Sequence, residues 1–252
     1  SVEAALEVAL RLHSRRPAGP REDILVFLTG AEEIATAAHA ARELAAALPA
    51  ELPALEVVAL HAALPADEQA RALAPAPAGS RKLILSTNVA ETSLTIDGVR
   101  AVVDPGYAKE KSFVRERGME VLATARISRS AAAQRAGRAG RTAPGEVWRL
   151  YSEADFDAMA AEPTPEIARC NLAHALLLLK SMGIARPAAL EWLDPPPPAA
   201  LVGAARQLYL LDAIDVSGAL TADGRRMARL PLEPCLARFC LAAARLRCVR
   251  AA

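Results

Sequence analysis

The sequence predicts an α/β protein in which a parallel sheet with helices on both faces precedes a small, mainly helical domain. Three observations carry this prediction: short apolar runs that favour strands, helical periodicity between several of them, and helical periodicity alone beyond Pro163. The 252 residues suffice for two domains, each with its own core. Hydrophobic residues make up 53% of the chain and aromatic residues only 4%, so we expect aliphatic cores.

The expected strands are short runs of the kind that are buried on both faces of a parallel sheet. They are Ile24 to Leu28, Val57 to Leu60, Lys82 to Ser86, Val99 to Val103 and Val147 to Leu150. The first run stops at Thr29-Gly30, after which apolar residues recur at helical spacing from Ile34 to Leu48. This alternation of strand and helix predicts a layered α/β domain.

A β-hairpin is expected at about residues 109–125. Lys109 to Val114 and Met119 to Ala125 flank Arg115-Glu116-Arg117-Gly118, which has the length of a turn and a glycine suited to positive φ. We therefore predict a hairpin inserted in the sheet domain.

Beyond Thr164 the pattern becomes helical. An expected first helix carries one apolar stripe and is capped by Gly183; the stripe consists of Ile167, Leu172, Leu176, Leu179 and Met182. The prolines at 195–198 predict a rigid connection to a second helix, from Leu201 to Ile214. A turn at 215–218 then precedes a third helix near 221–229, so we expect a small bundle with a short β-wing.

Composition argues against several classes of protein. No apolar run approaches the ~20 residues of a membrane span, and the N-terminus lacks the layout of a secretion signal, so we expect a soluble, intracellular protein. The cysteines have no paired CxxC spacing and predict reduced, mostly buried thiols; they are Cys170, Cys235, Cys240 and Cys248. The four histidines are scattered, and His61 is expected to be structural rather than catalytic.

Positive charge is concentrated in one part of the chain. From Arg100 to Leu150, eleven Arg and Lys stand against five Asp and Glu, a local excess of six, whereas the formal net charge of the chain is +1. This stretch could face phosphate groups, although a solvated basic surface is the alternative.

The most informative segment is Gln134-Arg135-Ala136-Gly137-Arg138-Ala139-Gly140-Arg141, with arginines three residues apart among glycines. The planar guanidinium suits the charge on a transferring γ-phosphoryl group, and glycine lets the backbone approach phosphate closely. Together with Ser86-Thr87-Asn88-Val89-Ala90-Glu91-Thr92-Ser93, the segment indicates a nucleotide-driven motor acting on nucleic acid. An arginine-rich surface turn would be the alternative for an isolated RxxR.

Three ordered motifs resemble those of helicases. Asp23 to Gly30 with Glu32-Glu33-Ile34 resembles motif IV, Ser86 to Asp97 resembles motif V, and Gln134 to Arg141 resembles motif VI. Pro165 to Leu172 and Pro231 to Pro234 are similar to the winged-helix and ratchet-like parts of one family. The chain thus resembles the second RecA-like domain and the start of the C-terminal region of DEAH-box (DEAH/RHA) RNA helicases.

The resemblance implies a division of the chain into three parts. Residues 1–162 would form the second RecA-like domain, residues 163–230 a winged-helix domain, and residues 231–252 the start of a ratchet-like helical domain. The hairpin at 109–125 resembles the one that separates strands or contacts the RNA end in the family, a role that rests on analogy.

The resemblance also implies residues of an ATP site. Arg138 and Arg141 would be arginine fingers that stabilise charge on the γ-phosphate, and Gln134 would contact that phosphate or orient the attacking water. Arg135 is expected to anchor the loop internally.

Three further residues would belong to the nucleotide side of the site. Ser93 would sense the nucleotide state, and Asp97 would accept a hydrogen bond from a ribose hydroxyl; ordinary turn packing is the alternative for Ser93. Leu73 stands where the family has an aromatic residue against the base, so we expect weaker base contact. Ala31, where the family has glutamine, departs from motif IV.

On the nucleic-acid side, Thr87 and Asn88 would bind backbone oxygens without reading bases, so recognition should be largely independent of sequence. Thr29 and Gly30 resemble the RNA-facing loop of motif IV. Lys109 resembles a phosphate contact of the family, with a solvated surface lysine as the alternative.

The motifs of the other half of an ATP site are missing from these residues. Neither a GxxxxGK[ST] phosphate loop nor the magnesium-binding acidic motif occurs, so we expect this chain alone not to hydrolyse ATP and assign it no metal ligand. Because Ser1 already lies within a helical pattern, we expect a piece of a longer protein. A preceding first RecA-like domain would then hold most of the ATP and Mg²⁺ site.

The resemblance implies the C-terminal part of an ATP-dependent RNA helicase that couples hydrolysis to 3′–5′ translocation and to RNA unwinding or RNP remodelling. The implied partners are RNA, the first RecA-like domain and an activating protein cofactor, and the implied location is the nucleus or nucleolus, with the cytoplasm as an alternative. A non-catalytic RNA-binding or regulatory remnant is the competing function. An unrelated basic α/β protein is the third.

Overall fold

The computed structural model describes residues 1–15, 22–92, 94–114, 117–140 and 144–248, and the chain forms two compact units. The first unit comprises residues 1–110 and 123–163, and the second comprises residues 111–122 and 164–252. Within the described part of the chain, no helix is both long and apolar enough to cross a membrane.

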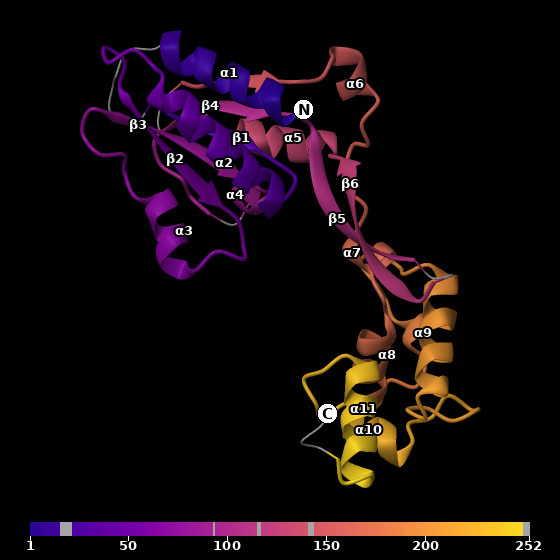
Figure 1. The fold of residues 1–252 in the computed structure, drawn as a ribbon. Coiled ribbons are helices and arrows are strands. Elements are labelled where there is room, and N and C mark those ends of the chain that lie inside the picture. The colour runs from indigo at the N-terminus through magenta and orange to yellow at the C-terminus, as the bar shows by residue number, and fades with distance from the viewer. Residues whose placement is uncertain (16–21, 93, 115–116, 141–143, 249–252) are drawn as a thin grey trace. The chain divides into compact units, whose positions relative to one another are not determined.

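The first unit is built on a five-stranded parallel sheet of order β2-β3-β1-β4-β7 (Figure 1). Its strands are β1 Asp23–Phe27, β2 Ala54–Leu60, β3 Ser80–Ser86, β4 Val99–Asp104 and β7 Glu146–Arg149. The predicted parallel sheet is confirmed. Strands β2 and β3 begin more than one residue earlier than expected, because residues 54–56 pair in register with residues 80–82.

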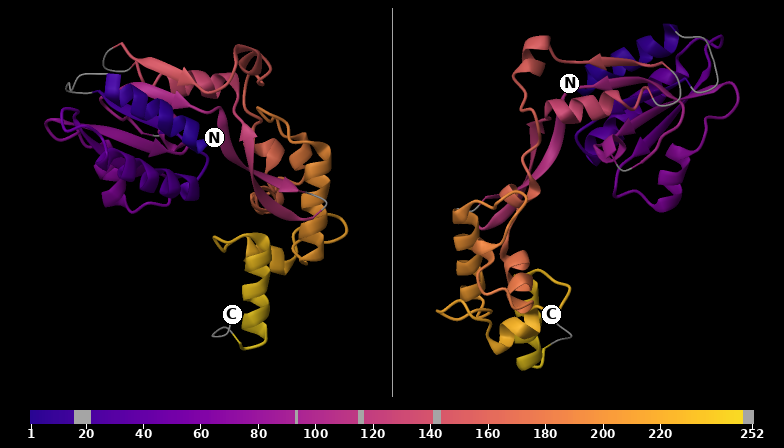
Figure 2. Two further views of the ribbon diagram at one scale, coloured as in Figure 1. Left: turned by 45° about the horizontal axis from the view of Figure 1, so that its top comes forward. Right: turned by 180° about the vertical axis from the view of Figure 1, so that it is seen from behind.

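Helices cover both faces of this sheet, as predicted. The helices of the first unit are α1 Val2–Arg15, α2 Ala31–Ala46, α3 Ala66–Leu73, α4 Val89–Thr92, α5 Arg129–Ala136 and α6 Glu153–Asp157. Helix α1 packs on β1 and β4 and helix α2 on β2 and β3, whereas α3 and α4 contribute to the core on the other face. The right-hand view of Figure 2 shows the unit from behind the view of Figure 1.

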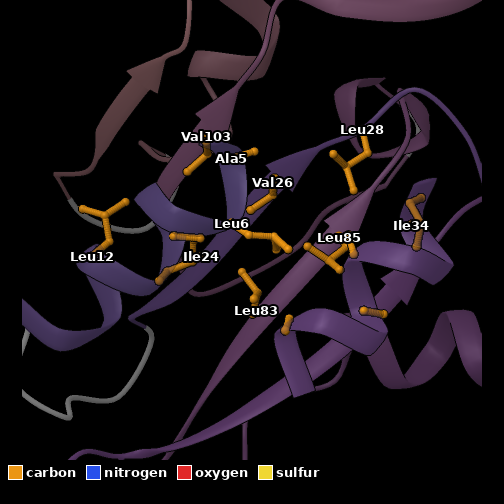
Figure 3. Packing of buried hydrophobic residues seen from close by; sticks show 14 of the residues in the cluster. Ala5, Leu6, Leu12, Ile24, Val26, Leu28, Ile34, Leu83, Leu85 and Val103 are labelled. Atoms are coloured by element: carbon orange, nitrogen blue, oxygen red, sulfur yellow. The ribbon is translucent and has the colours of Figure 1, made fainter. Parts of the chain in front are cut away.

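The central strand β1 divides the core into two layers. Ile24, Val26 and Leu28 pack with α1 and α2 (Figure 3), whereas Leu25 and Phe27 pack with α3 and α4 on the opposite face. Every residue of β1 is buried, as expected for a strand covered on both sides.

The hairpin consists of β5 Tyr107–Val114 and β6 Met119–Arg126. Gly118 has a φ of +63°, as expected for the turn glycine, while Arg115 and Glu116 lie outside the described residues. The predicted hairpin is therefore present. Residues 111–122 group with the second unit, because their contacts are made there, and only the two ends of the hairpin remain with the sheet.

The second unit is mainly helical. Its helices are α7 Glu166–Arg169, α8 Ala173–Ser181, η1 Pro187–Ala189, α9 Pro198–Leu210, α10 Ala222–Met227 and α11 Pro234–Arg245. Between α10 and the end of α9, Ile214 and Leu220 form an antiparallel bridge, which is the expected short wing. The turn between them is held by Asp215, whose carboxylate accepts from Ser217 N and Ala219 N.

The first expected helix of this unit is in fact two helices, α7 and α8. The chain becomes extended at Cys170, and the Asn171 side chain accepts a hydrogen bond from Ala173 N at 2.9 Å in the turn that precedes α8. Met182 is not part of the apolar stripe, since it is 76% exposed. Gly183, with a φ of +89°, closes α8 as predicted.

The expected second helix ends earlier than predicted. Helix α9 stops at Leu210, because Leu211 is its C-cap and Asp212 adopts a positive φ of 56° that breaks the helix. Leu211 and Ile214 still pack in the core of the unit, so the apolar stripe continues beyond the helix that it predicted.

The expectation of mostly buried thiols is wrong. Cys170 is half-buried, whereas Cys235, Cys240 and Cys248 are exposed.

A buried histidine lies beside a buried arginine in the first unit. The Arg81 guanidinium donates to the carbonyl oxygen of His13 at 3.0 Å and lies 3.4 Å from its Nδ1. Burial, and then the positive charge of Arg81, lower the pKa of His13. The folded unit therefore favours the neutral imidazole.

We predict that this histidine makes the chain less stable in weak acid. Below pH ~6.5, the usual pKa of histidine, the unfolded chain binds a proton at His13 that the folded chain does not bind, so the free energy of unfolding falls as the pH falls. Urea denaturation between pH 5.5 and 8 should show this loss, and His13→Gln should reduce it. Identical pH dependence in both chains would contradict the prediction.

Candidate functional site

The predicted nucleic-acid contacts lie at the carboxyl edge of the parallel sheet. Thr29 and Gly30 follow β1, and Thr87 and Asn88 follow the neighbouring strand β3. The two strand ends are joined by a hydrogen bond from Leu28 N to Ser86 O at 2.7 Å. In open α/β sheets this edge is where ligands bind.

Lys109 lies directly against Gly30. A Cβ built on Gly30 would come within 2.9 Å of the Lys109 Nζ atom, so the lysine side chain crosses the space that only glycine leaves open. The structure thus brings together two residues that lie far apart in the sequence and that were both predicted to face RNA. An ammonium group at this edge favours an anionic ligand.

Thr29 is held by its backbone rather than by its hydroxyl group. Its N–H donates to Glu33 Oε2 at 3.1 Å, whereas its Oγ1 is buried and makes no hydrogen bond with the described residues. Glu33, which sequence reasoning treated only as part of a motif, therefore shapes the loop after β1. The unsatisfied hydroxyl is the kind of group that a ligand would satisfy.

Thr87 and Asn88 lead directly into the single-turn helix α4. The N–H of Glu91 donates to Asn88 O at 3.0 Å, and that of Ala90 donates to Thr87 O at 3.3 Å. The Asn88 side chain is exposed at the start of this turn. Motif V is therefore a short, hydrogen-bonded connection from the sheet edge to Glu91.

Of the predicted nucleotide-side residues Leu73, Ser93, Asp97 and Arg141, the structure describes two. Asp97 is exposed, and Leu73 is partly buried against the core beside α3 and α4. Ser93 and Arg141 lie outside the described residues. The structure therefore leaves these four assignments as predictions.

The first part of motif VI is helical. Gln134 and Arg135 lie on α5, whose N-cap Ser128 accepts a hydrogen bond from Ala131 N at 3.1 Å, and the turn begins at Gly137. The Gln134 side chain is exposed. A Cβ on Gly140 would meet no described atom within 4 Å, so packing against these residues does not demand glycine there.

Arg135 is buried, with 1% of its surface exposed, and its guanidinium is bound inside the first unit. Its Nε pairs with Glu91 Oε2 at 3.0 Å, and its Nη1 pairs with Asp104 Oδ1 at 2.8 Å and donates to Tyr107 O at 3.2 Å. The guanidinium also lies 4.5 Å from the centre of the Phe27 ring. The expectation of an internal anchoring role is confirmed.

Asp104 holds a second partner. Its Oδ2 accepts a hydrogen bond from the Tyr151 hydroxyl at 3.1 Å. Burial, and then the Asp104 carboxylate, raise the pKa of Tyr151, so the phenol remains a hydrogen-bond donor at neutral pH. The end of β4 is thereby joined to the segment after β7.

Arg138 contacts the backbone of motif V. Its Nη1 donates to Leu94 O at 2.9 Å and its Nη2 donates to Glu91 O, and only 8% of the residue is exposed. The resemblance assigns Arg138 to the γ-phosphate, but in this structure Arg138 binds backbone carbonyl groups of motif V. The resemblance assigns Thr87 and Asn88 of the same motif to RNA.

Sequence reasoning missed two glycines that the site requires. A Cβ on Gly145 would lie 2.0 Å from Ala139 O, and Gly106, with a φ of +82°, packs against the Tyr151 ring. Gly145 permits the close return of the chain to motif VI before β7. The sequence signal was the Pro-Gly dipeptide in each case, Pro105-Gly106 and Pro144-Gly145, which is typical of turns.

No group of three or more His, Cys, Asp or Glu side chains that could hold a metal ion occurs among the described residues. The carboxylates nearest to the arginines, Glu91 and Asp104, are already paired with Arg135. These residues do not fit a magnesium site within the described part of the chain.

The fold and the site define a helicase domain of the RecA-like class, with motif V and motif VI joined at the carboxyl edge of a parallel sheet. Residues 6–143 match the family model of the helicase conserved C-terminal domain. Residues 204–232 match the winged-helix model of the helicase associated domain (HA2).

The chain belongs to the DEAH-box helicases, of which it comprises the second RecA-like domain and the winged-helix region. It is 44% identical, over 248 residues, to the pre-mRNA-splicing factor ATP-dependent RNA helicase prp22 of Schizosaccharomyces pombe. That match covers 98% of this chain and 21% of the relative, so the chain spans about a fifth of that protein's length.

Solved structures show the same relationship. The crystal structure of the Escherichia coli DEAH/RHA helicase HrpB matches with a TM-score of 0.86 and 35% identity, over 96% of this chain and 30% of that one. A crystal structure of the E. coli DExH-box NTPase HrpB matches with a TM-score of 0.81 and 36% identity, over 94% of this chain and 28% of that one.

We predict that Arg135→Ala destabilises the first unit by about 3–5 kcal/mol, because it leaves two largely buried carboxylates without their partner. Arg11→Ala is the matched control, since the Arg11 side chain is 65% exposed and pairs along α1 with Glu7. Urea denaturation of the two variants measures the difference. Equal stabilities would show that the buried pairs contribute nothing.

Proposed function

We propose that this chain is the C-terminal part of an ATP-dependent RNA helicase that couples ATP hydrolysis to 3′–5′ translocation along RNA and to RNA unwinding or RNP remodelling. One observation carries the proposal: Arg138 of motif VI donates directly to Glu91, which follows Thr87 and Asn88 of motif V within about one helical turn. A motor needs such a connection between its nucleotide side and its nucleic-acid side. A binding module does not.

On the RNA side, the proposed contacts are with the sugar-phosphate backbone. Thr87 and Asn88 offer a hydroxyl and an amide, Thr29 and Gly30 offer a hydroxyl and backbone N–H, and Lys109 offers an ammonium group. None of these groups needs a particular base, so binding should depend little on sequence. The proximity of Lys109 to Gly30 supports a common phosphate.

On the nucleotide side, Arg138 and Arg141 would stabilise charge on the γ-phosphoryl group, and Gln134 would orient the attacking water. Asp97 would accept from a ribose hydroxyl, Ser93 would sense the nucleotide state, and Leu73 would cover the base. These six positions form half of a site. Bound ATP with Mg²⁺ supplies the phosphoryl group whose transfer drives the motor, and a first RecA-like domain would hold most of both.

The cellular setting is part of the proposal. The relative from S. pombe is described as a pre-mRNA-splicing factor, which supports a nuclear location and an RNP substrate. An activating protein partner and the ratchet-like identity of residues 231–252 follow from the family resemblance alone. Retention of Gln134 and Arg138 supports the motor over a non-catalytic RNA-binding remnant.

The genomic sequence upstream of these residues tests the motor directly. A GxxxxGK[ST] loop followed by Asp-Glu-Ala-His in the same reading frame is the expected result. If the native protein lacks both motifs, the chain is a remnant and the proposal fails.

We predict that Lys109→Ala weakens binding of single-stranded RNA to the chain to a similar degree for different sequences. Loss of one phosphate contact should also reduce the slope of log K against log salt concentration by about 0.7. Fluorescence anisotropy with oligo(U) and mixed-sequence RNA, with Lys180→Ala as the control, measures both effects. An effect confined to one sequence would contradict backbone recognition.

We further predict that Arg138→Ala in the full-length protein lowers RNA-stimulated ATP turnover by about 10³-fold or more, while RNA affinity stays nearly unchanged. Arg138→Lys keeps the charge but not the planar fork of donors, so it should restore little activity. Steady-state ATPase assays and RNA binding measure the two quantities. Unchanged turnover would show that the finger assignment is wrong.

A further inference from the structure

Glu91 is contacted by both described arginines of motif VI. Its carboxylate pairs with Arg135 Nε at 3.0 Å, and its backbone carbonyl accepts from the Arg138 guanidinium. The Glu91 side chain is only 14% exposed, which strengthens the ion pair relative to one in water. One residue of motif V thus holds motif VI at two points.

The same residue is connected to the sheet edge without an intervening loop. Glu91 N donates to Asn88 O at 3.0 Å, Thr87 N donates to Leu60 O at 3.2 Å, and Ser86 Oγ donates to the same carbonyl at 3.0 Å. A displacement of Thr87 and Asn88 must therefore move Glu91. Since α4 is a single turn, little of that movement can be absorbed within it.

Arg135 gives Glu91 a fixed reference point. Its Nη1 is held by Asp104 and by Tyr107 O, and its guanidinium lies over Phe27, so it is tied to the ends of β1 and β4. Arg138, by contrast, donates to two backbone carbonyls of motif V, those of residues 91 and 94. The position of Glu91 relative to Arg135 therefore determines where its carbonyl meets the Arg138 guanidinium.

We propose that Glu91 is a positioning residue that couples RNA contact at Thr87 and Asn88 to the placement of the Arg138 guanidinium. The proposal rests on the proposed helicase function. RNA contact shifts α4 and with it the Glu91 carbonyl. The Glu91–Arg135 ion pair limits how far that carbonyl moves. Because the Arg138 guanidinium donates to the carbonyl, the movement directs Arg138 toward or away from the nucleotide. Glu91 itself touches neither ligand.

The test is the ratio of RNA-stimulated to basal ATP turnover in the full-length protein. Glu91→Ala should lower this ratio by about tenfold, the size of a typical coupling free energy between two sites. The KM for ATP and the Kd for RNA should each stay within about twofold, since the proposal gives Glu91 no contact with either ligand. Glu91→Gln, which keeps an acceptor for Arg135 without the charge, should restore part of the ratio.

Ser128→Ala is the matched control for a purely structural effect. It removes the N-cap of α5, the helix that carries Arg135, and so lowers the Tm without touching Glu91. Its stimulation ratio should equal that of the wild type. If Glu91→Ala lowers the Tm but leaves the ratio intact, Glu91 is structural only and the inference is wrong.

Two further outcomes separate a failure of the Glu91 inference from a failure of the proposed helicase function. A ratio that falls only in proportion to lost RNA affinity would place Glu91 in RNA binding and would also overturn the inference. A wild-type protein without any RNA-stimulated turnover would instead overturn the proposed helicase function.

Discussion

The buried guanidinium of Arg135 is the constraint on which the rest of the site depends. A charge removed from water must keep its partners, so Glu91 on α4 and Asp104 at the end of β4 have to stay within reach of α5. The backbone carbonyl of Tyr107 and the ring of Phe27 also contact the guanidinium. Elements that are separate in the sequence are thereby held in one geometry, and motif V and motif VI can only be placed together.

The amino and carboxyl edges of the sheet differ in the contacts that their polar and charged side chains make. At the amino edge, Asp23 Oδ1 accepts from Lys82 N at 2.9 Å, and the Lys82 ammonium donates to Ala72 O at 2.8 Å, so buried charges are satisfied within the chain. At the carboxyl edge, the Thr29 hydroxyl is buried without a hydrogen-bond partner among the described residues, and Lys109 lies over Gly30. The hydroxyl alone does not distinguish the two edges, because Arg100 Nη1, near the start of β4, is also buried without a hydrogen-bond partner among the described residues. The lysine that lies against Gly30 is what favours an anionic ligand at the carboxyl edge.

Hydrophobic pattern predicted most of the first unit, because strands buried on both faces are continuous apolar runs that few other structures tolerate. It failed where polar interactions decide the structure. One expected helix is divided into α7 and α8 by a turn in which Asn171 accepts a hydrogen bond from Ala173 N, and no apolar period records that hydrogen bond. The hairpin strands were found from turn chemistry, but residues 111–122 join the second unit through tertiary contacts that local sequence does not encode. Within the site, residue type indicated the role of Arg135, whereas the double contact of Glu91 depended on backbone geometry.

The three-residue spacing of Arg135 and Arg138 has a structural reason, because it gives the two side chains different partners on the same side of the segment. Arg135 lies in the last turn of α5, and Arg138 N donates to Arg135 O at 3.1 Å, so the helical sense continues for one more turn. Residues three apart then lie on the same side, and both guanidinium groups meet Glu91, one at its carboxylate and one at its carbonyl. An arginine two or five residues away would point elsewhere. The spacing therefore allows one arginine to anchor the segment inside the unit while the next binds the backbone of motif V.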